Sequence, residues 1–379
     1  MSPVAARISL KTPVLAAAIA VVLTVAAQGE PLSYNKDIRP ILFDNCFACH
    51  GPDSASRKAG LRLDKFEEAT KANKDGLAAI VPGDLAKSGL AARITTQDAD
   101  DLMPPPESHK KLKPEQIATL QRWITEGAKY EPHWSFIAPS RPAVPVVDNP
   151  AWSQNPIDAF LLKEMKAAGL TPNPEADRHT LARRASLDLT GLPPEPALVE
   201  EFVKDAAPGA WERLLDKLMA SPHYGEHRAR YWLDAARYAD TSGIHFDNYK
   251  EIWHYRQWVI EAFNRNERFD QFTIEQLAGD LLPNRSLDQQ IASGFNRCNI
   301  TTNEGGAIPE EYLVLYARDR TETTSQVFMG LTTGCAVCHD HKYDPVSQRD
   351  FYSLSAFFNN TTQAAMDGNV QNTPPVIPV

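Results

Sequence analysis

Four of the five cysteines lie in two copies of one short pattern, in which two cysteines separated by two residues are followed directly by a histidine. C-x-x-C-H is the attachment motif for c-type haem. The thiols form thioethers with the vinyl groups of the porphyrin, and the adjacent imidazole binds the iron. The residues concerned are Cys46, Cys49 and His50 in the first copy and Cys335, Cys338 and His339 in the second. We therefore predict two covalently attached haems c, with His50 and His339 as iron ligands.

Three other uses of paired cysteines compete with haem. A thioredoxin-like C-x-x-C needs a βαβ context, which neither copy has. A zinc site needs four converging ligands, and each copy supplies at most three nearby. A disulfide is compatible with an exported protein. The repetition of the pattern, each time ending in histidine, favours haem. The fifth cysteine, Cys298, has no partner at motif spacing and is predicted to be a small buried residue.

Met103 is the predicted sixth ligand of the first iron. It follows the first motif and stands in a proline-rich stretch between Asp101 and Pro106. Small class I cytochromes c place their axial methionine on a proline-bounded loop of this kind. A thioether is a soft ligand that favours ferrous iron, so ligation by His50 and Met103 would raise the reduction potential. The alternative is that Met103 packs in the core and His109 is the ligand.

The second iron has no comparable loop. His341 is two residues from His339 and cannot reach the opposite face of the same iron, so a second-shell or exposed position is expected for it. Other candidates exist, but no spacing singles one out: Met329, Met366, His223, His227, His245 and His254. A five-coordinate iron with an open face is equally compatible and would suit catalysis.

The N-terminus predicts export. Residues 1–27 contain Arg7 and Lys11, no acidic residue, and an apolar run from Val14 to Ala27. Such a run is short for a membrane span, which needs about 20 residues, and suits a cleaved signal peptide. The alternative is an uncleaved N-terminal anchor. We expect a soluble mature protein in the periplasm, where covalent haem attachment also takes place.

The composition of the chain limits the classes of partner that we expect it to bind. The 379 residues contain 39 Lys+Arg and 48 Asp+Glu, giving a formal net charge of -9. An acidic chain without a concentrated basic stretch is a poor candidate for nucleic-acid binding. The acidic surface predicts transient docking with a basic redox partner protein.

Helical patterns dominate the chain, and sustained alternation typical of strands is scarce. In the first part a helix is expected over Asp37–Phe43. A second is expected after Pro114, with Trp123 packing against the domain's N-terminal helix and Gly127 ending it. Further helices are expected over Asp158–Ala168, His179–Asp188, Glu195–Lys204, Ala210–Ala220, His227–Ala239, Ile252–Phe263, Ile274–Leu282 and Glu310–Gly330. The predicted fold class is mainly α.

Six prolines between residues 131 and 156 predict a stiff, extended linker. The predicted organisation is a signal peptide (1–27), a class I cytochrome c-like haem domain (33–130), the linker (131–156), a larger and mostly helical second domain carrying the second haem motif (157–360), and an extended tail (361–379).

Several stretches together resemble the planctomycete-type cytochrome c domain followed by the planctomycete-specific second cytochrome domain, a domain of unknown function. In the first domain these are Asn35–Leu42, the first haem motif, Gly60–Asp64, Pro82–Asp84, Met103–Pro105 and Trp123–Ile124. In the second they are Leu187–Pro194, Trp232–Asp240, Thr302–Gly306 and Gly334–Asp344. The resemblance implies exported haem-binding proteins in electron transfer, with no established substrate. Members commonly continue into a further C-terminal domain, so we expect a short form or a fragment.

A polar constellation in the second domain is open to two interpretations. Arg228, Asp234, Arg237 and Asp240 recur at helical spacing, and Glu310, Glu311, Asp319 and Arg320 share a predicted helix. They form either a pocket that orients a substrate beside the second haem or buried ion pairs and helix caps, with arginines also anchoring haem propionates. The second interpretation is favoured.

The sequence therefore predicts a periplasmic dihaem cytochrome that transfers single electrons. Two alternatives stay open. One is a peroxidase- or dehydrogenase-like enzyme with an open second haem and a small-molecule substrate. The other is a binding module for polysaccharide or protein tethered to a cytochrome.

Overall fold

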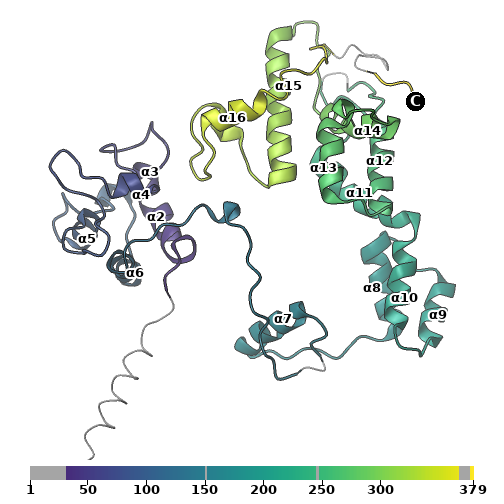
Figure 1. Ribbon diagram of the computed structural model, residues 1–379, viewed down its shortest axis with the longest axis horizontal. Helices are drawn as coiled ribbons and strands as arrows, with labels where there is room; N and C mark the ends of the chain where they lie inside the picture. The colour runs from purple at the N-terminus through teal and green to yellow at the C-terminus, as the bar shows by residue number, and fades with distance from the viewer. Residues whose placement is uncertain (1–30, 150–151, 245–246, 367–375) are drawn as a thin grey trace, which may run out of the picture. The chain divides into compact units, whose positions relative to one another are not determined.

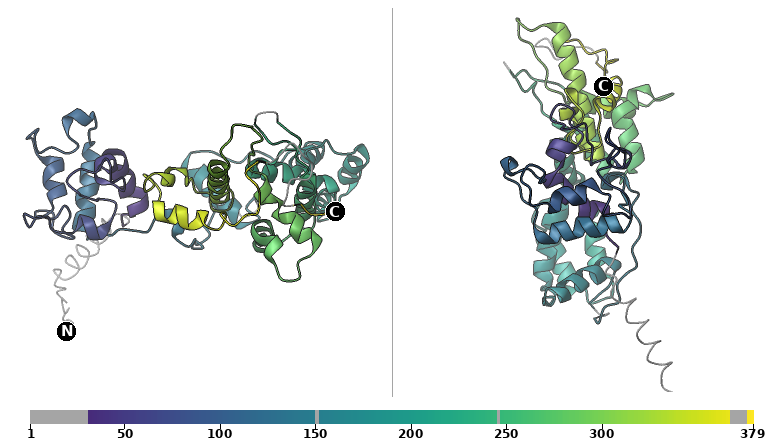
Figure 2. Two further views of the ribbon diagram at one scale, coloured as in Figure 1. Left: turned by 90° about the horizontal axis from the view of Figure 1, so that it is seen from above. Right: turned by 90° about the vertical axis from the view of Figure 1, so that its left-hand side faces the viewer.

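A computed structural model describes residues 31–149, 152–244, 247–366 and 376–379. Within these ranges the chain is helical and contains isolated bridges but no strand. Figures 1 and 2 show helices and loops throughout. The prediction of a mainly α fold is confirmed, with a cytochrome-like N-terminal domain and a larger helical domain behind it. The predicted signal peptide, His245 and most of the predicted tail lie outside the described residues.

The chain forms two compact units. The first extends to Pro139 and also includes His339–Pro345, and the second comprises Ser140–Cys338 and Val346–Val379. Within the first unit, Arg39 Nη2 donates to the carbonyl oxygen of Tyr343 (2.8 Å), and the rings of Phe43 and Tyr343 lie 4.9 Å apart. The short segment after the second motif therefore packs on the N-terminal part of the chain.

Short helices and loops build the first unit. The helices are a π-helical turn at Tyr34–Ile38, α2 (Arg39–Asn45), α3 (Phe47–His50), α4 (Phe66–Ala69), α5 (Gly89–Thr95), a 3-10 turn at Pro106–Ser108 and α6 (Pro114–Thr125). Helix α6 begins at proline, whose missing N–H is not needed at a helix N-terminus. Gly127 follows with a φ of +100°, a conformation that glycine adopts without strain.

One apolar core holds the first unit together. Leu42, Leu120 and Trp123 are almost completely buried in it. The ring of Trp123 lies 5.9 Å from that of Tyr34, in the N-terminal turn, and its Nε1 donates to the carbonyl oxygen of Lys129 (3.0 Å). The predicted packing role of Trp123 is confirmed.

Eight of the helices in the second unit lie where the sequence predicts helix. They are α7 (Pro156–Ala167), α8 (Arg178–Thr190), α9 (Pro196–Lys204), α10 (Ala210–Met219), α11 (Pro222–Ala236), α12 (Trp253–Asn264), α13 (Phe269–Ala278) and α15 (Pro309–Thr324). Helix α11 begins five residues earlier than predicted because Ser221 caps it and Pro222 occupies its first turn. Two helices were not predicted, α14 (Leu287–Ala292) and α16 (Gln348–Ser355).

Helices α11 and α12 pack side by side (Figure 1) and contribute to the larger core of the second unit. This core contains a buried polar triad. Trp232 Nε1 donates to Gln276 Oε1 (2.7 Å), and so does the hydroxyl of Tyr255 (2.7 Å). Because both donors share one acceptor, the triad fixes α11, α12 and α13 against one another without leaving these groups unpaired.

Between α6 and α7, a single 3-10 turn at Trp134–Phe136 interrupts the otherwise irregular described chain. The boundary between the two units, at Pro139 and Ser140, falls within this stretch. Among the described residues, no helix combines the length and the apolar character needed to cross a bilayer.

Candidate functional site

The first paired-cysteine motif forms a single helical turn. Helix α2 ends at Cys46, whose amide donates to the carbonyl oxygen of Leu42 (2.7 Å), and α3 begins directly after it. The amide of His50 then donates to the carbonyl oxygen of Cys46 (2.8 Å). A Cβ atom at Gly51 would lie 2.3 Å from the carbonyl oxygen of Phe47. Only glycine fits this position, because the backbone approaches itself too closely for a side chain.

The two thiols of the first motif differ in environment. Cys46 is buried and Cys49 is exposed, and both are unpaired. Burial raises the pKa of the Cys46 thiol to about 12, because an apolar environment disfavours the thiolate. The motif thus presents two reduced sulfur atoms on one turn, as covalent attachment to one porphyrin edge requires.

His50 is half-buried beside them. Its Nδ1 atom is buried without a hydrogen-bond partner among the described residues. Burial lowers the pKa of His50, since it disfavours the charged imidazolium. A neutral imidazole is the form that ligates a metal. The unpartnered Nδ1 atom and the two free thiols therefore fit a covalently held haem.

The two candidates for the sixth ligand of the first iron have different surroundings. Met103 is half-buried, and its amide donates to the carbonyl oxygen of Arg93 in α5 (2.9 Å). His109 is exposed and ends the Pro106–Ser108 turn with a φ of +55°. The assignment of Met103 stays a prediction.

The second motif lies on a 3-10 turn, Gly334–Val337, at the end of the second unit's Ser140–Cys338 segment. Its cysteines, Cys335 and Cys338, are both exposed and unpaired. Two side chains from α16 hold the turn by donating to the carbonyl oxygen of Val337: Gln348 Nε2 (3.0 Å) and the Tyr352 hydroxyl (3.1 Å). Sequence reasoning missed this helix and therefore missed what positions the second motif.

Two histidines close to the second motif have opposite hydrogen-bond patterns. His339 Nδ1 lies 2.8 Å from the carbonyl oxygen of Asp340. Because a carbonyl only accepts, Nδ1 carries the proton and Nε2 keeps its lone pair, the arrangement typical of a metal-ligating histidine. His341 Nδ1 instead accepts from the amides of Tyr343 (3.2 Å) and Asp344 (2.8 Å), so its neutral ring carries the proton on Nε2.

His341 is 4% exposed, so of the two positions expected for it, second-shell or exposed, the structure shows a buried one. Its Nδ1 stabilises the turn that follows the motif. This is a structural role, and it leaves neither nitrogen of the neutral ring open to a metal.

The remaining candidates for the sixth ligand of the second iron lie apart along the second unit. Met329 is 51% exposed, and Met366 belongs to a backbone bridge with Thr302. His223 Nδ1 contacts Glu226 (2.6 Å), and His254 stacks on Trp253. His227 packs closely against Gly191, where an added Cβ atom would lie 2.4 Å from His227 Nδ1.

Two further observations concern the cysteines and possible metal clusters. No disulfide joins the cysteines of either motif, since all five cysteines are free. In the part of the chain that the structure describes, no group of three or more His, Cys, Asp or Glu side chains could hold a metal ion. Cys298 is buried, as predicted, and burial raises the pKa of its thiol to about 12.

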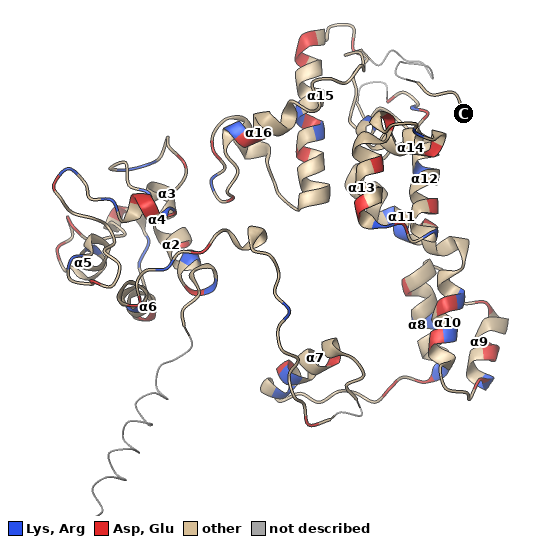
Figure 3. Cartoon of the chain, in the orientation of Figure 1, with Lys and Arg blue, Asp and Glu red and all other residues tan. Residues whose placement is uncertain are grey.

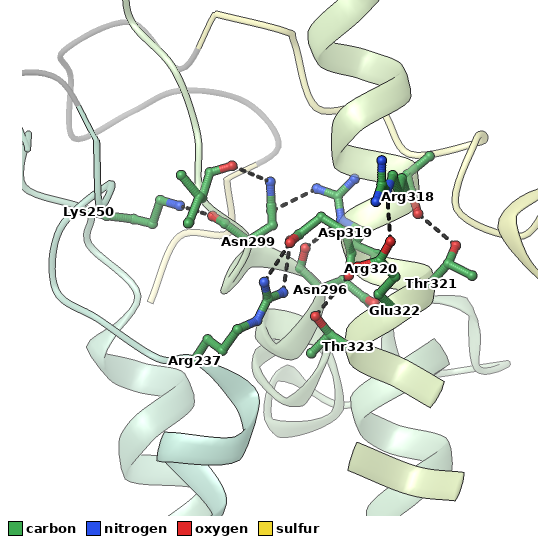
Figure 4. Close-up of polar contacts among 12 residues, drawn as sticks. Arg237, Lys250, Asn296, Asn299, Arg318, Asp319, Arg320, Thr321, Glu322 and Thr323 are labelled. Atoms are coloured by element: carbon green, nitrogen blue, oxygen red, sulfur yellow. Dashed lines mark hydrogen bonds and ion pairs between the residues drawn. The ribbon is translucent and has the colours of Figure 1, made fainter. Parts of the chain in front are cut away.

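The polar constellation of the second unit does not converge on one point. Arg237 makes a bidentate ion pair with Asp319 in α15 (2.5 and 2.8 Å; Figure 4). Arg228 instead donates to the carbonyl oxygen of Asp188 (3.1 Å), and Asp240 accepts from the Tyr238 hydroxyl (2.5 Å). The interpretation as separate ion pairs and caps accounts for these contacts.

Arg320, on the inward face of α15, is the most buried of these charged residues. Its guanidinium donates to the carbonyl oxygen of Asn296 (2.8 Å), Asn299 Oδ1 (3.0 Å) and Thr361 Oγ1 (3.2 Å). These neutral oxygens and Gln363 satisfy it without a carboxylate. Burial lowers its pKa to about 10. It ties α15 to the segment near Thr361.

Two protein families match the chain, in the order predicted. The model of planctomycete cytochrome C, PSCyt1, matches residues 46–107, which include the first motif and Met103. The model of PSCyt2, a protein of unknown function (DUF1549), matches residues 156–363, which include the second motif, α15 and α16. No curated protein and no solved structure matches the chain.

A planctomycete cytochrome C domain implies covalently bound haem c. The match to residues 156–363 covers more than half of the 379 residues. The chain is therefore a cytochrome-type haem protein that belongs to the PSCyt2 family, with the planctomycete cytochrome C domain in front of the family's domain of unknown function.

Proposed function

We propose that this protein is an exported dihaem cytochrome that transfers electrons one at a time. The observation that carries the proposal is the repeated C-x-x-C-H pattern, with unpaired cysteines at both copies. Bound haem supplies an iron that changes between the ferric and ferrous states by one electron. The role of the protein is to hold the group, fix its ligands and control its access to water.

At the first site, Cys46 and Cys49 would provide the thioethers and His50 the proximal ligand. The helical turn presents all three from one short segment, and the buried Nδ1 atom of His50 supports a ring held away from water. Met103 would complete the coordination. Ligation by a thioether raises the potential, so we expect the first site to favour ferrous iron.

At the second site, Cys335 and Cys338 would provide the thioethers and His339 the proximal ligand. The hydrogen bond from Nδ1 to the carbonyl oxygen of Asp340 orients the ring and leaves Nε2 for the metal.

We infer export from the N-terminal segment and the kind of redox partner from the charge of the chain. Haem c is attached outside the cytoplasm, and residues 1–27 have the pattern of a signal peptide. Acidic and basic residues alternate along α15 and are not separated by sign (Figure 3), while the whole chain carries a net charge of -9. An acidic cytochrome would dock transiently with a basic redox protein, and binding would weaken as salt rises.

The test is the haem stoichiometry of periplasmically matured protein, measured by pyridine haemochrome absorbance and intact mass. We expect two haems per chain. Replacing Cys46 and Cys49 by serine, or Cys335 and Cys338 by serine, should each leave one. A wild-type value of one, with no change on replacing the second pair, would contradict the dihaem proposal.

The exposure of the second motif favours one alternative, a haem enzyme with an open second iron. Cys335, Cys338 and His339 are all exposed. The spin state decides between the two functions. Two low-spin irons support pure electron transfer, whereas a high-spin iron that binds cyanide and disappears with the Cys335/Cys338 pair supports the enzyme.

A further inference from the structure

An unassigned groove lies on the second unit. It has a volume of about 280 Å³, close to the lower limit of roughly 300 Å³ for small-molecule sites. Its walls come from α15 and from two isoleucines in preceding loops: Ile244, Ile300, Tyr312, Leu315, Tyr316, Arg318, Asp319 and Glu322. The α15 residues recur every three or four positions, so they form one stripe along the helix.

The end of the stripe nearer the start of α15 is apolar. Ile300 and Leu315 are 46% and 41% exposed, although branched aliphatic side chains gain free energy from being covered. The Tyr316 hydroxyl is already engaged, because it donates to the carbonyl oxygen of Ala365 (2.8 Å) and accepts from the amide of Thr302 (2.7 Å). Tyr316 therefore offers the groove its ring and not its oxygen.

The other end is polar, and its charges are paired. Asp319 and Glu322 bring two carboxylates, and Arg318 brings one guanidinium. Glu322 Oε1 accepts from Arg318 Nε (2.7 Å), and Asp319 is fixed by Arg237, the residue that follows α11 (Figure 4). The carboxylates are thus held in place as acceptors. Each oxygen can accept more than one hydrogen bond, so each retains capacity for a ligand.

We propose that this groove binds a small uncharged phenolic compound, a single aromatic ring with one or two hydroxyls on one edge. The ring would cover Leu315 and Ile300, and the hydroxyls would donate to Asp319 and Glu322. Phenols have pKa values near 10, so they are neutral donors at pH 7.

Two other ligand classes fit less well. A carboxylate or phosphate would have to compete with Asp319 and Glu322 for the guanidiniums of Arg237 and Arg318, which already pair with them. A sugar carries hydroxyls around its whole ring, and those against the aliphatic wall would lose water without gaining a partner.

The groove ends beside the second motif. A Cβ atom at Gly334, the residue before Cys335, would lie 3.1 Å from Glu322 Oε1. A ligand that reaches Glu322 would therefore lie next to the second paired-cysteine turn. That it would lie next to a haem rests on the proposed function, whereas the binding itself does not.

The experiment compares two substitutions on one helix. Leu315→Trp fills the groove. Leu313→Trp adds the same bulk at a residue of similar exposure, 44%, that does not line it. Catechol is the probe, and benzoate and cellobiose are the comparison ligands. Binding to the matured full-length protein is measured by calorimetry and saturation-transfer NMR, with circular dichroism to verify folding.

We expect saturable catechol binding with a dissociation constant on the order of 1 mM or lower, weakened at least tenfold by Leu315→Trp and less than twofold by Leu313→Trp. Absence of saturable binding would overturn the proposal, as would equal effects of the two tryptophans. Cellobiose or benzoate binding as tightly as catechol would also overturn it. Binding should persist when Cys335 and Cys338 are replaced by serine. A haem count of one in the wild-type protein would therefore contradict the proposed function without affecting this result.

Discussion

The two C-x-x-C-H motifs share a sequence pattern but differ in what supports them. The first lies at the edge of an apolar core, with Cys46 buried and Gly51 packed against the backbone of its own turn. The second exposes both cysteines and is held by hydrogen bonds from α16 to the carbonyl oxygen of Val337. The pattern specifies how haem attaches, and the surroundings specify how rigidly the attachment point is held.

This difference has functional consequences. A buried turn fixes ligands and excludes water, which suits an iron that keeps two protein ligands. A turn held at one carbonyl on an exposed surface leaves room for a second molecule to approach, which suits a site that exchanges electrons or ligands with its surroundings. The predictions below test this contrast.

The largest expected difference is in thiol reactivity. In protein made without haem, Cys46 should alkylate with iodoacetamide on the order of 1,000-fold more slowly at pH 8 than a small-molecule thiol. Its pKa of about 12 keeps nearly all of it protonated, and the thiolate is the nucleophile. The rate should rise about tenfold per pH unit toward pH 12.

Peptide mass spectrometry follows this reaction site by site. Cys298 is the internal control, because it is also buried with a pKa raised to about 12. The exposed Cys335 and Cys338 should react well before either. Equal rates at Cys46 and Cys335 would mean that the first motif is not packed as described.

Alanine substitutions at Gly51 and Gly334, the glycines next to the two motifs, should differ in how much they destabilise the protein. Gly51→Ala should destabilise the first unit by about 2–3 kcal/mol, because the new Cβ meets a backbone oxygen at 2.3 Å. Gly334→Ala should cost less than about 1 kcal/mol, since the contact at 3.1 Å is longer and is with the end of the Glu322 side chain and not with the backbone.

Hydrogen exchange measured on separate peptides reports each unit on its own. The peptide covering α6 should lose protection in Gly51→Ala and keep it in Gly334→Ala. Loss of protection in both variants would contradict the contrast between the two motifs.

Removing the predicted methionine ligand should have an effect of similar size on the first site alone. In matured protein, Met103→Ala should abolish the thioether–iron charge-transfer band and lower the potential of the first haem by on the order of 0.1 V, because a soft ligand that stabilises ferrous iron is lost.

His109→Ala is the matched control and should leave both the band and the potential unchanged. Potentiometric titration with optical detection measures both. If the band persists in Met103→Ala, or disappears in His109→Ala, the ligand assignment is wrong.

Local patterns in the sequence were sufficient for much of the fold. The apolar stripe of α6 and its opening proline predicted that helix, and Trp123 packs where the stripe placed it. These features could be predicted from the sequence because they depend on residues three or four positions apart on one helix. The haem motifs could be predicted for the same reason, since the attachment residues of each motif lie within five consecutive positions.

The contacts that hold the second motif in place could not be predicted from the sequence. Tyr352 and Gln348 reach Val337 across more than ten residues of chain, and no local pattern encodes that contact. Arg237 and Asp319 were both singled out, yet their pairing joins residues 82 positions apart, and no local pattern encodes that contact either. For His341 the sequence left a second-shell and an exposed position open, and the structure shows it buried, accepting from two backbone amides.

The smallest expected effect concerns the α16 contact. Tyr352→Phe removes one of the two hydrogen bonds to Val337 and should lower the local stability of the turn by about 0.5–1 kcal/mol. Combining it with Gln348→Ala should roughly double this. The readout is exchange of the Ala336 amide, which donates to the carbonyl oxygen of Thr333 (2.9 Å). Tyr249→Phe, at an exposed tyrosine, controls for loss of a phenol.

Faster exchange at Ala336 in the Tyr352 variant, with no change in the Tyr249 variant, would show that α16 stabilises the turn. Unchanged exchange in the double variant would instead assign that role to α15, whose Glu322 lies against Gly334. Ligand binding in the groove and the geometry of the second motif would then depend on the same carboxylate. Catechol should in that case slow exchange at Ala336, an effect that support from α16 alone does not predict.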